Sequence, residues 1–317
     1  MNRKERRDLA RRNFDKVLGE ESEERVIHKE TYSGILGFFE KNYKKLLIFP
    51  FIMLILALIV LGTQLAITGD FVNKGVSLKG GVSVTLMGDT DINSIESLLR
   101  NSHPGADIII RGISEFGTQI GLTIETDLTE DDVFNVLETI IPNVRDNASV
   151  ETMGPSLGES FFKQTVIAVL VAFVFMAIVV FIYFRNPVTS GAVILAAFSD
   201  IVVTLAVVNI MGLRLSTAGV AAFLMLIGYS VDTDILLSTR VVRQKEGSIF
   251  ARVLSAMKTG LTMQITTFAA LAVGLMFSES EVLRQIMTIL MIGLIVDIIN
   301  TWIQNAGLLR WYLENES

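Results

Sequence analysis

Cysteine is absent from the 317-residue sequence, and histidine occurs only at His28 and His103. Without thiols the chain can form no disulfide, no thiolate nucleophile and no cysteine-ligated metal site. Both histidines lie outside the long apolar runs, which argues against a histidine metal site or proton relay within a membrane. No group of residues is typical of an enzyme, so we expect no metal, no cofactor and no catalytic activity. The net charge of −6 is too small to indicate a nucleic-acid partner.

Apolar residues are abundant instead. They make up 51% of the chain, and the mean hydropathy is +0.53, far above that of a soluble globular protein. A helix needs about 20 apolar residues to cross ~30 Å of hydrocarbon. Six such runs are present, at residues 46–67, 164–184, 188–210, 216–238, 259–278 and 285–309. The sequence therefore predicts a polytopic α-helical membrane protein with six transmembrane helices.

Lysine and arginine predict the orientation, because they concentrate on the cytoplasmic side of a membrane. With a cytoplasmic N-terminus, the segments on that side carry 19 of the 27 basic residues. No cleavable signal peptide is visible before the first apolar run. We expect a multi-pass protein of the cell membrane with both termini in the cytoplasm. Its parts would be a charged tail against anionic lipid or a partner (1–45), a first helix (46–67), an extracytoplasmic domain (68–160), a five-helix bundle (161–310) and a cytoplasmic C-terminus (311–317).

Residues 68–160 show the pattern β-α-β-β-α-β. Residues 76–86 alternate like a strand, residues 91–100 have helical spacing, and residues 106–113 and 118–126 suggest a hairpin interrupted at 115–117. Thr129 is expected to cap a second helix, with Asp132 reaching back to it. A last strand follows Pro142 and ends near Thr152. This order is typical of the ferredoxin-like, split βαβ arrangement, a module that usually binds or docks.

Four acidic residues lie within the predicted spans: Asp200, Asp232, Asp234 and Asp297. A charged side chain near the bilayer centre costs at least about 2.5–3.5 kcal/mol on insertion scales and commonly belongs to an ion or proton pathway. A desolvated carboxyl can gain and lose a proton near neutral pH. The alternative is that these groups only fix the register of the helices through hydrogen bonds. We favour proton or ion coupling for Asp200 and the Asp232–Asp234 pair, and leave both interpretations open for Asp297.

Asp232 and Asp234 cannot share one partner. Successive residues of a helix point 100° apart, so these two side chains point about 200° apart. Asp234 shares a face with Ser230 and Ser238. One acid is expected to face the bundle interior and the other a second interface or water, and the spacing leaves open which is which.

The fifth span carries a polar stripe. Thr259, Thr262 and Thr266 follow i, i+3, i+7 spacing and are expected to form hydrogen bonds at a helix interface. Lys258, at the cytoplasmic end of the span, is a candidate partner for an acid of the fourth span. It therefore joins the acids as a candidate coupling residue.

Several motifs in this sequence also occur in one known family. They are Gly80-Gly81 after the first span, residues 154–158 (Gly-Pro-Ser-Leu-Gly) before the second, Ser199-Asp200 in the third, Gly228-Tyr229-Ser230 with Asp232 and Asp234 in the fourth, and Lys258-Thr259 with Thr262 and Thr266 in the fifth. Together they resemble SecF, the smaller of two paired accessory subunits of the Sec protein translocase, in its archaeal form. Bacterial members commonly read Asn-Asp-Thr at positions 232–234, so their acid aligns with Thr233.

The resemblance, which runs from about Leu46 to Leu309, implies a role in protein export. The implied partners are SecD, the Sec translocon channel and the translocating polypeptide, which the outward domain would engage. The intramembrane acids, with Lys258, would couple an ion gradient to movement. The family is related to the resistance-nodulation-division (RND) transporters. An RND-like secondary transporter of a small solute or lipid is therefore the alternative, and a purely structural subunit is the third possibility.

Overall fold

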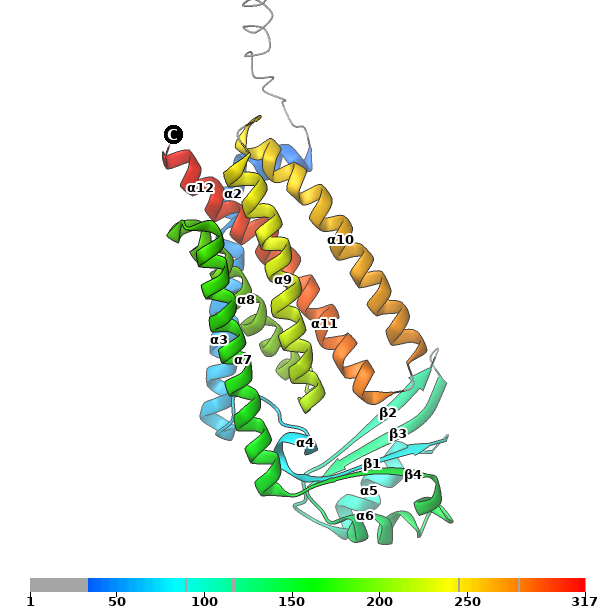
Figure 1. The fold of residues 1–317 in the computed structure, drawn as a ribbon. Coiled ribbons are helices and arrows are strands. Elements are labelled where there is room, and N and C mark those ends of the chain that lie inside the picture. The colour runs from blue at the N-terminus through cyan, green and yellow to red at the C-terminus, as the bar shows by residue number, and fades with distance from the viewer. Residues whose placement is uncertain (1–33, 89, 116–117, 245, 279, 317) are drawn as a thin grey trace, which may run out of the picture.

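The computed structural model describes residues 34–88, 90–115, 118–244, 246–278 and 280–316 as a bundle of long helices with a small β-sheet at one end (Figure 1). Within these residues six helices are long and apolar enough to cross a membrane, which confirms the predicted multi-pass architecture. They are α3 (Ile48–Thr68), α7 (Pro155–Phe184), α8 (Pro187–Ile210), α9 (Thr217–Arg243), α10 (Ile249–Phe277) and a continuous rod made of α11 (Glu281–Ile299), the π-helical segment η2 (Asn300–Asn305) and α12 (Ala306–Glu316).

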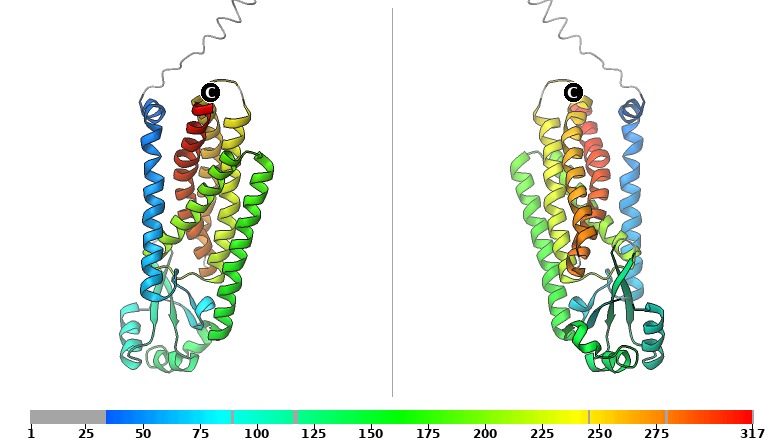
Figure 2. Two further views of the ribbon diagram at one scale, coloured as in Figure 1. Left: turned by 90° about the vertical axis from the view of Figure 1, so that its left-hand side faces the viewer. Right: turned by 90° about the vertical axis from the view of Figure 1, so that its right-hand side faces the viewer.

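Helices α8 and α9 form the centre of the bundle. More than half of the residues in their most apolar stretches are buried, whereas fewer than one in five are buried in α3, α7 and α10. Figure 2 shows α3 and α7 at opposite edges of the bundle. Side-chain oxygens of Asn186, Ser216, Ser248 and Ser280 accept hydrogen bonds from the first backbone N–H groups of α8, α9, α10 and α11. These N-caps define where the helices begin.

The sheet has the strand order β2-β3-β1-β4, and every neighbouring pair is antiparallel. Helix α5 (Ile92–Ser102) connects β1 (Gly81–Met87) to β2 (Ile108–Glu115). Helix α6 (Glu130–Leu137) and a 3₁₀ turn (Val144–Asn147) connect β3 (Thr118–Thr126) to β4 (Ala148–Met153). This is the split βαβ order that the sequence predicts. One face packs on α5 and α6 through Ile95, Leu99, Leu122, Ile124 and Phe134, and the other faces the bundle (Figure 1).

Residues 76–86 do not form one strand, so this part of the prediction is wrong. Val76–Lys79 form a single helical turn, α4, and β1 begins only at Gly81. Gly80 and Gly81 have φ values of 92° and 125°, which residues with a Cβ rarely adopt. A Cβ on Gly80 would lie 2.6 Å from the Cα of Pro155, and one on Gly81 would lie 2.3 Å from the carbonyl oxygen of Thr126. The glycine pair therefore redirects the chain into the sheet, directly against the start of α7.

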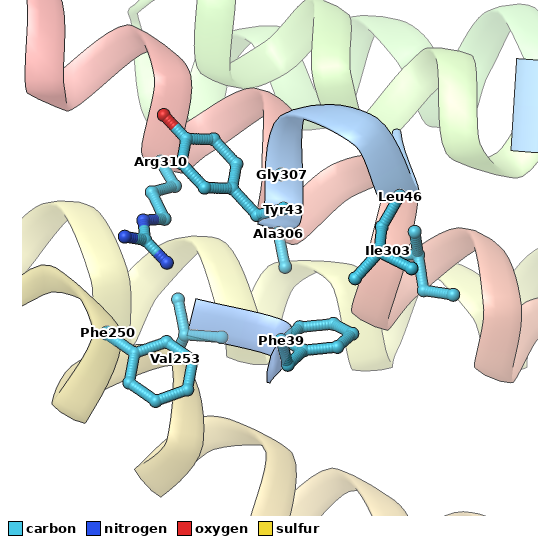
Figure 3. Close-up of a pocket in the computed structure, with 9 residues that line it drawn as sticks. All are labelled: Phe39, Tyr43, Leu46, Phe250, Val253, Ile303, Ala306, Gly307 and Arg310. Atoms are coloured by element: carbon cyan, nitrogen blue, oxygen red, sulfur yellow. The ribbon is translucent and has the colours of Figure 1, made fainter. Parts of the chain in front are cut away.

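A short helix, α2 (Ile35–Leu46), lies at the end of the bundle opposite the sheet (Figure 1). The guanidinium of Arg310 in α12 lies 4.1 Å from the ring centroid of Tyr43 (Figure 3). The Tyr43 hydroxyl donates a hydrogen bond to Glu314. Burial and this carboxylate raise the pKa of Tyr43 to about 12, so the hydroxyl remains a donor. These contacts hold α2 against α12. The preceding part of the predicted tail, residues 1–33, lies outside the described residues.

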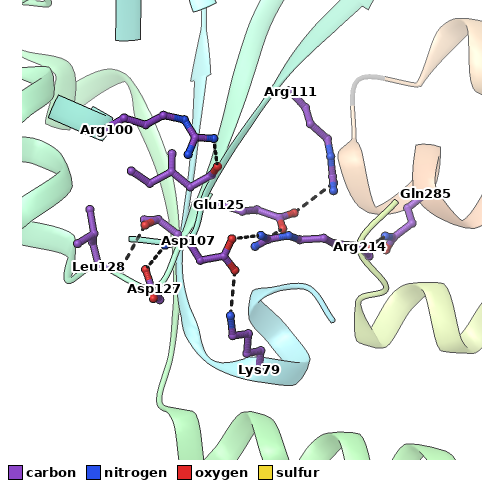
Figure 4. Close-up of polar contacts among 11 residues, drawn as sticks. Lys79, Arg100, Asp107, Arg111, Glu125, Asp127, Leu128, Arg214 and Gln285 are labelled. Atoms are coloured by element: carbon purple, nitrogen blue, oxygen red, sulfur yellow. Dashed lines mark hydrogen bonds and ion pairs between the residues drawn. The ribbon is translucent and has the colours of Figure 1, made fainter. Parts of the chain in front are cut away.

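Arg214, in the connection between α8 and α9, joins the bundle to the sheet (Figure 4). Its guanidinium lies 2.6 Å from Asp107 and 3.7 Å from Glu125, and its side chain is 9% exposed. Lys79 also binds Asp107, at 2.9 Å, and Arg111 binds Glu125, at 3.3 Å. Burial raises the pKa of Asp107, but Lys79 and Arg214 outweigh this effect and the net shift is downward. For Glu125 burial dominates, and its pKa is raised despite Arg111 and Arg214.

Backbone hydrogen bonds reinforce this junction. The N–H of Leu215 donates to the carbonyl oxygen of Asn73 at 2.7 Å, and the N–H of Gly75 donates to the carbonyl oxygen of Leu215 at 2.8 Å. Gln285 of α11 donates to the carbonyl oxygen of Arg214. The α8–α9 connection is therefore held by the chain leading into the sheet on one side and by α11 on the other.

Replacing Arg214 with methionine keeps the apolar stem and removes the cation. Breaking a fully buried ion pair costs about 3–5 kcal/mol. Because Asp107 is partly exposed, we expect about 1–2 kcal/mol here, or roughly a 5–30-fold increase in opening of the junction. Hydrogen exchange at the amides of Gly75 and Leu215 measures that opening. Glu96→Gln, which removes an exposed ion pair on α5, should leave both amides unchanged. Equal exchange in the two variants would contradict the role assigned to Arg214.

Candidate functional site

Three of the four acids predicted within the spans come together inside the bundle. Asp200 of α8, Asp234 of α9 and Asp297 of α11 are each 0% exposed. Asn300 bonds to Asp200, and its neighbour Thr301 lies against both Asp234 and Asp297, so one short segment holds the three carboxyl groups in a cluster. Within the described part of the chain, none of them forms an ion pair with a lysine, arginine or histidine. Neutral hydrogen-bond donors surround them instead.

Asp200 receives one donor on each carboxyl oxygen. The hydroxyl of Ser230, on α9, donates to Oδ2 at 2.5 Å. The side-chain amide of Asn300, in η2, donates to Oδ1 at 2.7 Å. Asp200 therefore links the two central helices to the last span.

Asp234 and Asp297 are joined by a shared hydroxyl. Thr301 Oγ1 lies 3.0 Å from Oδ1 of Asp234 and 2.9 Å from Oδ1 of Asp297. Asn305 also donates to Oδ1 of Asp234, at 2.7 Å, and Gln264 of α10 donates to Oδ2 of Asp297, at 2.6 Å. A continuous set of hydrogen bonds thus runs across α9, the last span and α10.

The single hydrogen of the Thr301 hydroxyl cannot serve both carboxyl groups. A hydroxyl has one hydrogen to donate but can accept further hydrogen bonds. Thr301 can therefore donate to only one of Asp234 and Asp297. The contact with the other becomes a hydrogen bond only if that carboxyl carries a proton and donates it to Thr301. The geometry suits a pair of acids that share a proton through one hydroxyl.

The polar residues of η2 are part of the site, and the sequence analysis missed them. Asn300, Thr301, Gln304 and Asn305 are all 0% exposed. All four fall in a six-residue segment of an otherwise apolar span. This concentration of amide and hydroxyl side chains could have identified the segment from the sequence. Residues 300–305 adopt a π-helix, a conformation that occurs mostly as single-turn bulges and often at functional sites.

Several buried oxygens in this region accept no hydrogen bond from the described residues. They are Oδ2 of Asp234, Oδ1 of Asn300, Oδ1 of Asn305 and Oε1 of Gln304. Buried polar atoms are normally satisfied, and exceptions often mark a functional position or a water site. The network therefore has spare acceptors: the Asp234 oxygen can take up a proton, and the three amide oxygens can accept hydrogen bonds from water. Within the described residues, no three His, Cys, Asp or Glu side chains are grouped to hold a metal ion.

Asp232 lies away from this cluster. The sequence left open which of Asp232 and Asp234 faces the bundle interior, and in the structure it is Asp234. The Asp232 side chain is exposed on the outer face of α9, whereas Asp234 is buried. Gly228, one turn earlier on the same face, has no atom within 4 Å of the position that a Cβ would occupy. Asp232 therefore belongs to an open helix face and not to the internal network.

Lys258 and the threonine stripe also lie outside the internal network. Lys258 is exposed and forms no ion pair within the described residues, so the structure does not bring it to a fourth-span acid, and its part in coupling stays a prediction. Thr262 and Thr266 are exposed, and their hydroxyls donate to carbonyl oxygens of their own helix. Thr259 is half-buried. The polar residue of α10 that reaches the acids is Gln264, which also accepts a hydrogen bond from the Trp302 indole at 2.9 Å.

Comparisons with known proteins agree on one family. A model described as protein export membrane protein SecD/SecF, C-terminal, matches residues 133–315. The chain is 39% identical over 278 residues to the protein-export membrane protein SecF of Pyrococcus furiosus, covering 86% of this chain and 92% of that protein. It is 40% identical over 284 residues to SecF of Methanothermobacter thermautotrophicus, covering 87% and 95%.

The fold also resembles a solved structure. The translocon-associated membrane protein SecDF from Thermus thermophilus superposes with a TM-score of 0.69 at 20% identity, covering 89% of this chain. The matched region is only 40% of the SecDF chain, so this protein corresponds to less than half of that molecule. On the family match and the extent of identity, the chain belongs to the SecF family of protein-export membrane proteins.

Proposed function

We propose that this chain assists protein export as a SecF subunit, paired with a SecD-like partner beside the Sec channel, and that its buried acids couple a proton gradient to helix movement. The observation that carries the coupling is the cluster of Asp200, Asp234 and Asp297, which is buried on three spans and forms no ion pair with any residue that the structure describes. Ionising all three carboxyls there is very unfavourable, so the cluster retains protons. Adding or removing one proton changes which side chain donates at Thr301, and hence how α9 bonds to the last span.

A SecD-like partner is supported by the SecDF structure and by the surface of α9. The Thermus protein named SecDF is a single chain of which this protein matches 40%, and the SecD-like partner would correspond to other parts of that molecule. The outer face of α9 exposes Asp232, Gly228 and Tyr229. A carboxylate on a membrane-spanning surface calls for a cation, a hydrogen-bond donor or water. A partner helix that packs on this face would supply one of the first two.

The distribution of basic residues supports an orientation with both termini in the cytoplasm. In this orientation the sheet lies outside the membrane, where a polypeptide leaving the channel is accessible to it. The Arg214 junction would then connect the export side of the protein to the central helices.

Replacing each buried acid by asparagine tests the coupling, because asparagine keeps the shape but cannot exchange a proton. We expect Asp200→Asn, Asp234→Asn and Asp297→Asn each to lower gradient-dependent export by roughly 100-fold, the scale of a positioned proton transfer. Asp232→Asn is the matched control and should have a much smaller effect. Infrared absorption of protonated carboxyl groups, compared in H₂O and D₂O, should lose intensity only in the first three. If all three variants still assembled with the partner and exported protein at the unmodified rate, the acids would have a purely structural role.

Thr301 is expected to carry the link between Asp234 and Asp297. Thr301→Val removes the hydroxyl without changing the shape and should reduce gradient-dependent export, at a stability cost of about 1–3 kcal/mol. Thr301→Ser restores the hydroxyl and should restore export. Thr204→Val is the control, because the Thr204 hydroxyl is buried on α8 without a hydrogen-bond partner among the described residues. If Thr301→Val exported as well as Thr301→Ser, the shared hydroxyl would have no part in coupling.

The partner surface is tested by adding bulk to α9. Because the space around Gly228 is open in this chain, Gly228→Trp should leave the isolated protein folded, with its melting temperature unchanged. The same change should abolish co-purification of a one-to-one complex with a SecD-like chain. Ile59→Trp, on the exposed surface of α3, is the control. A Gly228→Trp complex that forms normally places the partner elsewhere, and a self-paired dimer of this chain would favour the RND-like transporter.

A further inference from the structure

An apolar cavity of about 190 Å³ lies between α7, α8 and α9, toward the end of the bundle that carries the sheet. Its walls include Phe71, Phe162, Val169, Leu205 and Phe223, and all but one of its lining side chains are apolar. It contains none of the three buried acids. The proposed coupling therefore makes no use of it.

The cavity is suited to a hydrocarbon chain. An apolar cavity of about 150 Å³ in a protein stays dry and accepts ligands such as benzene or xenon. Here the wall formed by α7 belongs to a membrane-spanning helix, and Leu170 on that wall is 59% exposed. A side chain exposed on a membrane-spanning helix faces lipid wherever no other chain covers it, so a lipid chain is the apolar species that can enter the cavity from this side.

A basic residue stands at the level of the membrane surface beside this opening. Lys163 lies on the same row of α7 as Val166 and Leu170, which line the cavity. About 20 residues separate Lys163 from the far end of α7, or about 30 Å, which is the thickness of the hydrocarbon layer. Lys163 is exposed and forms no ion pair within the described residues.

A second lysine, Lys74, lies beside Phe162 of the cavity wall. The Lys74 Nζ lies 4.4 Å from the ring centroid of Phe162 and 2.7 Å from Asp70. Its charge is thereby already paired. It holds Phe162 in the cavity wall and leaves Lys163 as the cation available to a ligand.

We propose that this cavity is a binding site for one hydrocarbon chain of an anionic membrane phospholipid, with the lipid head group at Lys163. The chain fills the space between α7, α8 and α9, and the phosphate lies within reach of the Lys163 ammonium. The lipid would thus complete the packing of α7, the span with the least buried surface.

Lipid retention by the purified full-length protein tests this site. The protein is incubated with equal amounts of phosphatidylglycerol and phosphatidylcholine of identical chain length, and native mass spectrometry counts the lipids that remain bound. We expect phosphatidylglycerol to be retained about fivefold better, the effect of one lysine near an anionic head group. Lys163→Gln should remove that preference, and Lys163→Arg should keep it.

Filling the cavity provides the second arm of the experiment. Val169→Phe should abolish retention of either lipid, whereas Val174→Phe, at a position of α7 that is 55% exposed, should retain lipid as the unmodified protein does. Equal retention by Val169→Phe and Val174→Phe would overturn the proposal. If Val169→Phe does not fold, Lys163→Gln decides the question. If Lys163→Gln kept the preference for phosphatidylglycerol, the proposal would equally be overturned.

Discussion

The burial of Asp200, Asp234 and Asp297, with no ion pair to any of the described residues, constrains the rest of the bundle. A buried carboxyl is tolerated only where hydrogen-bond donors reach it, so α8, α9, α10 and the last span must all bring polar groups to one place. Close packing makes this possible. A Cβ on Gly260 would lie 2.3 Å from the ring of Trp302, so only glycine there lets the indole lie against α10 and bond to Gln264. Gly260 and the hydrogen bond between Trp302 and Gln264 therefore both serve to bring hydrogen-bond donors to the buried acids.

The π-helical segment of the last span bonds to α8 and α9 through two pairs of side chains. Asn300 and Gln304, four residues apart, donate to Asp200 and Ser199 of α8. Thr301 and Asn305, also four residues apart, donate to Asp234 of α9. The second pair follows the first by one residue, so the two pairs point about 100° apart around the helix. A single segment can therefore face α8 and α9 at once. The wider π-helical turn occurs at this point, where one span must satisfy acids on both of its neighbours.

Pattern rules predicted the spans and the acids within them, but not the rotation of each helix in the bundle. The spacing showed that Asp232 and Asp234 point in different directions, and Ser230 and Ser238 beside Asp234 were a sign of its buried face. Nothing in the periodicity of α10 distinguished Gln264 from the threonines, because the face that a helix buries depends on its neighbours. The strand expected at residues 76–86 failed for a local reason. The prediction used only the alternation of apolar and polar residues. It did not take into account that Gly80 and Gly81 can adopt backbone angles that end a helical turn and begin a strand.

Two sets of polar contacts join α9 to the last span, one at the start of α9 and one in its second half. Thr301 bonds to Asp234 in the second half, while Gln285 bonds to the backbone of Arg214 and accepts from Ser216, the cap of α9, at the start. About 17 residues of α9, or about 25 Å of helix, separate its first residue, Thr217, from Asp234. Because α9 is continuous over this length, it cannot slide along the last span without disturbing both sets. In the proposed coupling, a change in protonation that weakens the Thr301 contact would alter the force on Arg214, and through Asp107 and Glu125 on the sheet. The path from the buried acids to the sheet would then consist of α9, the last span and the Arg214 junction.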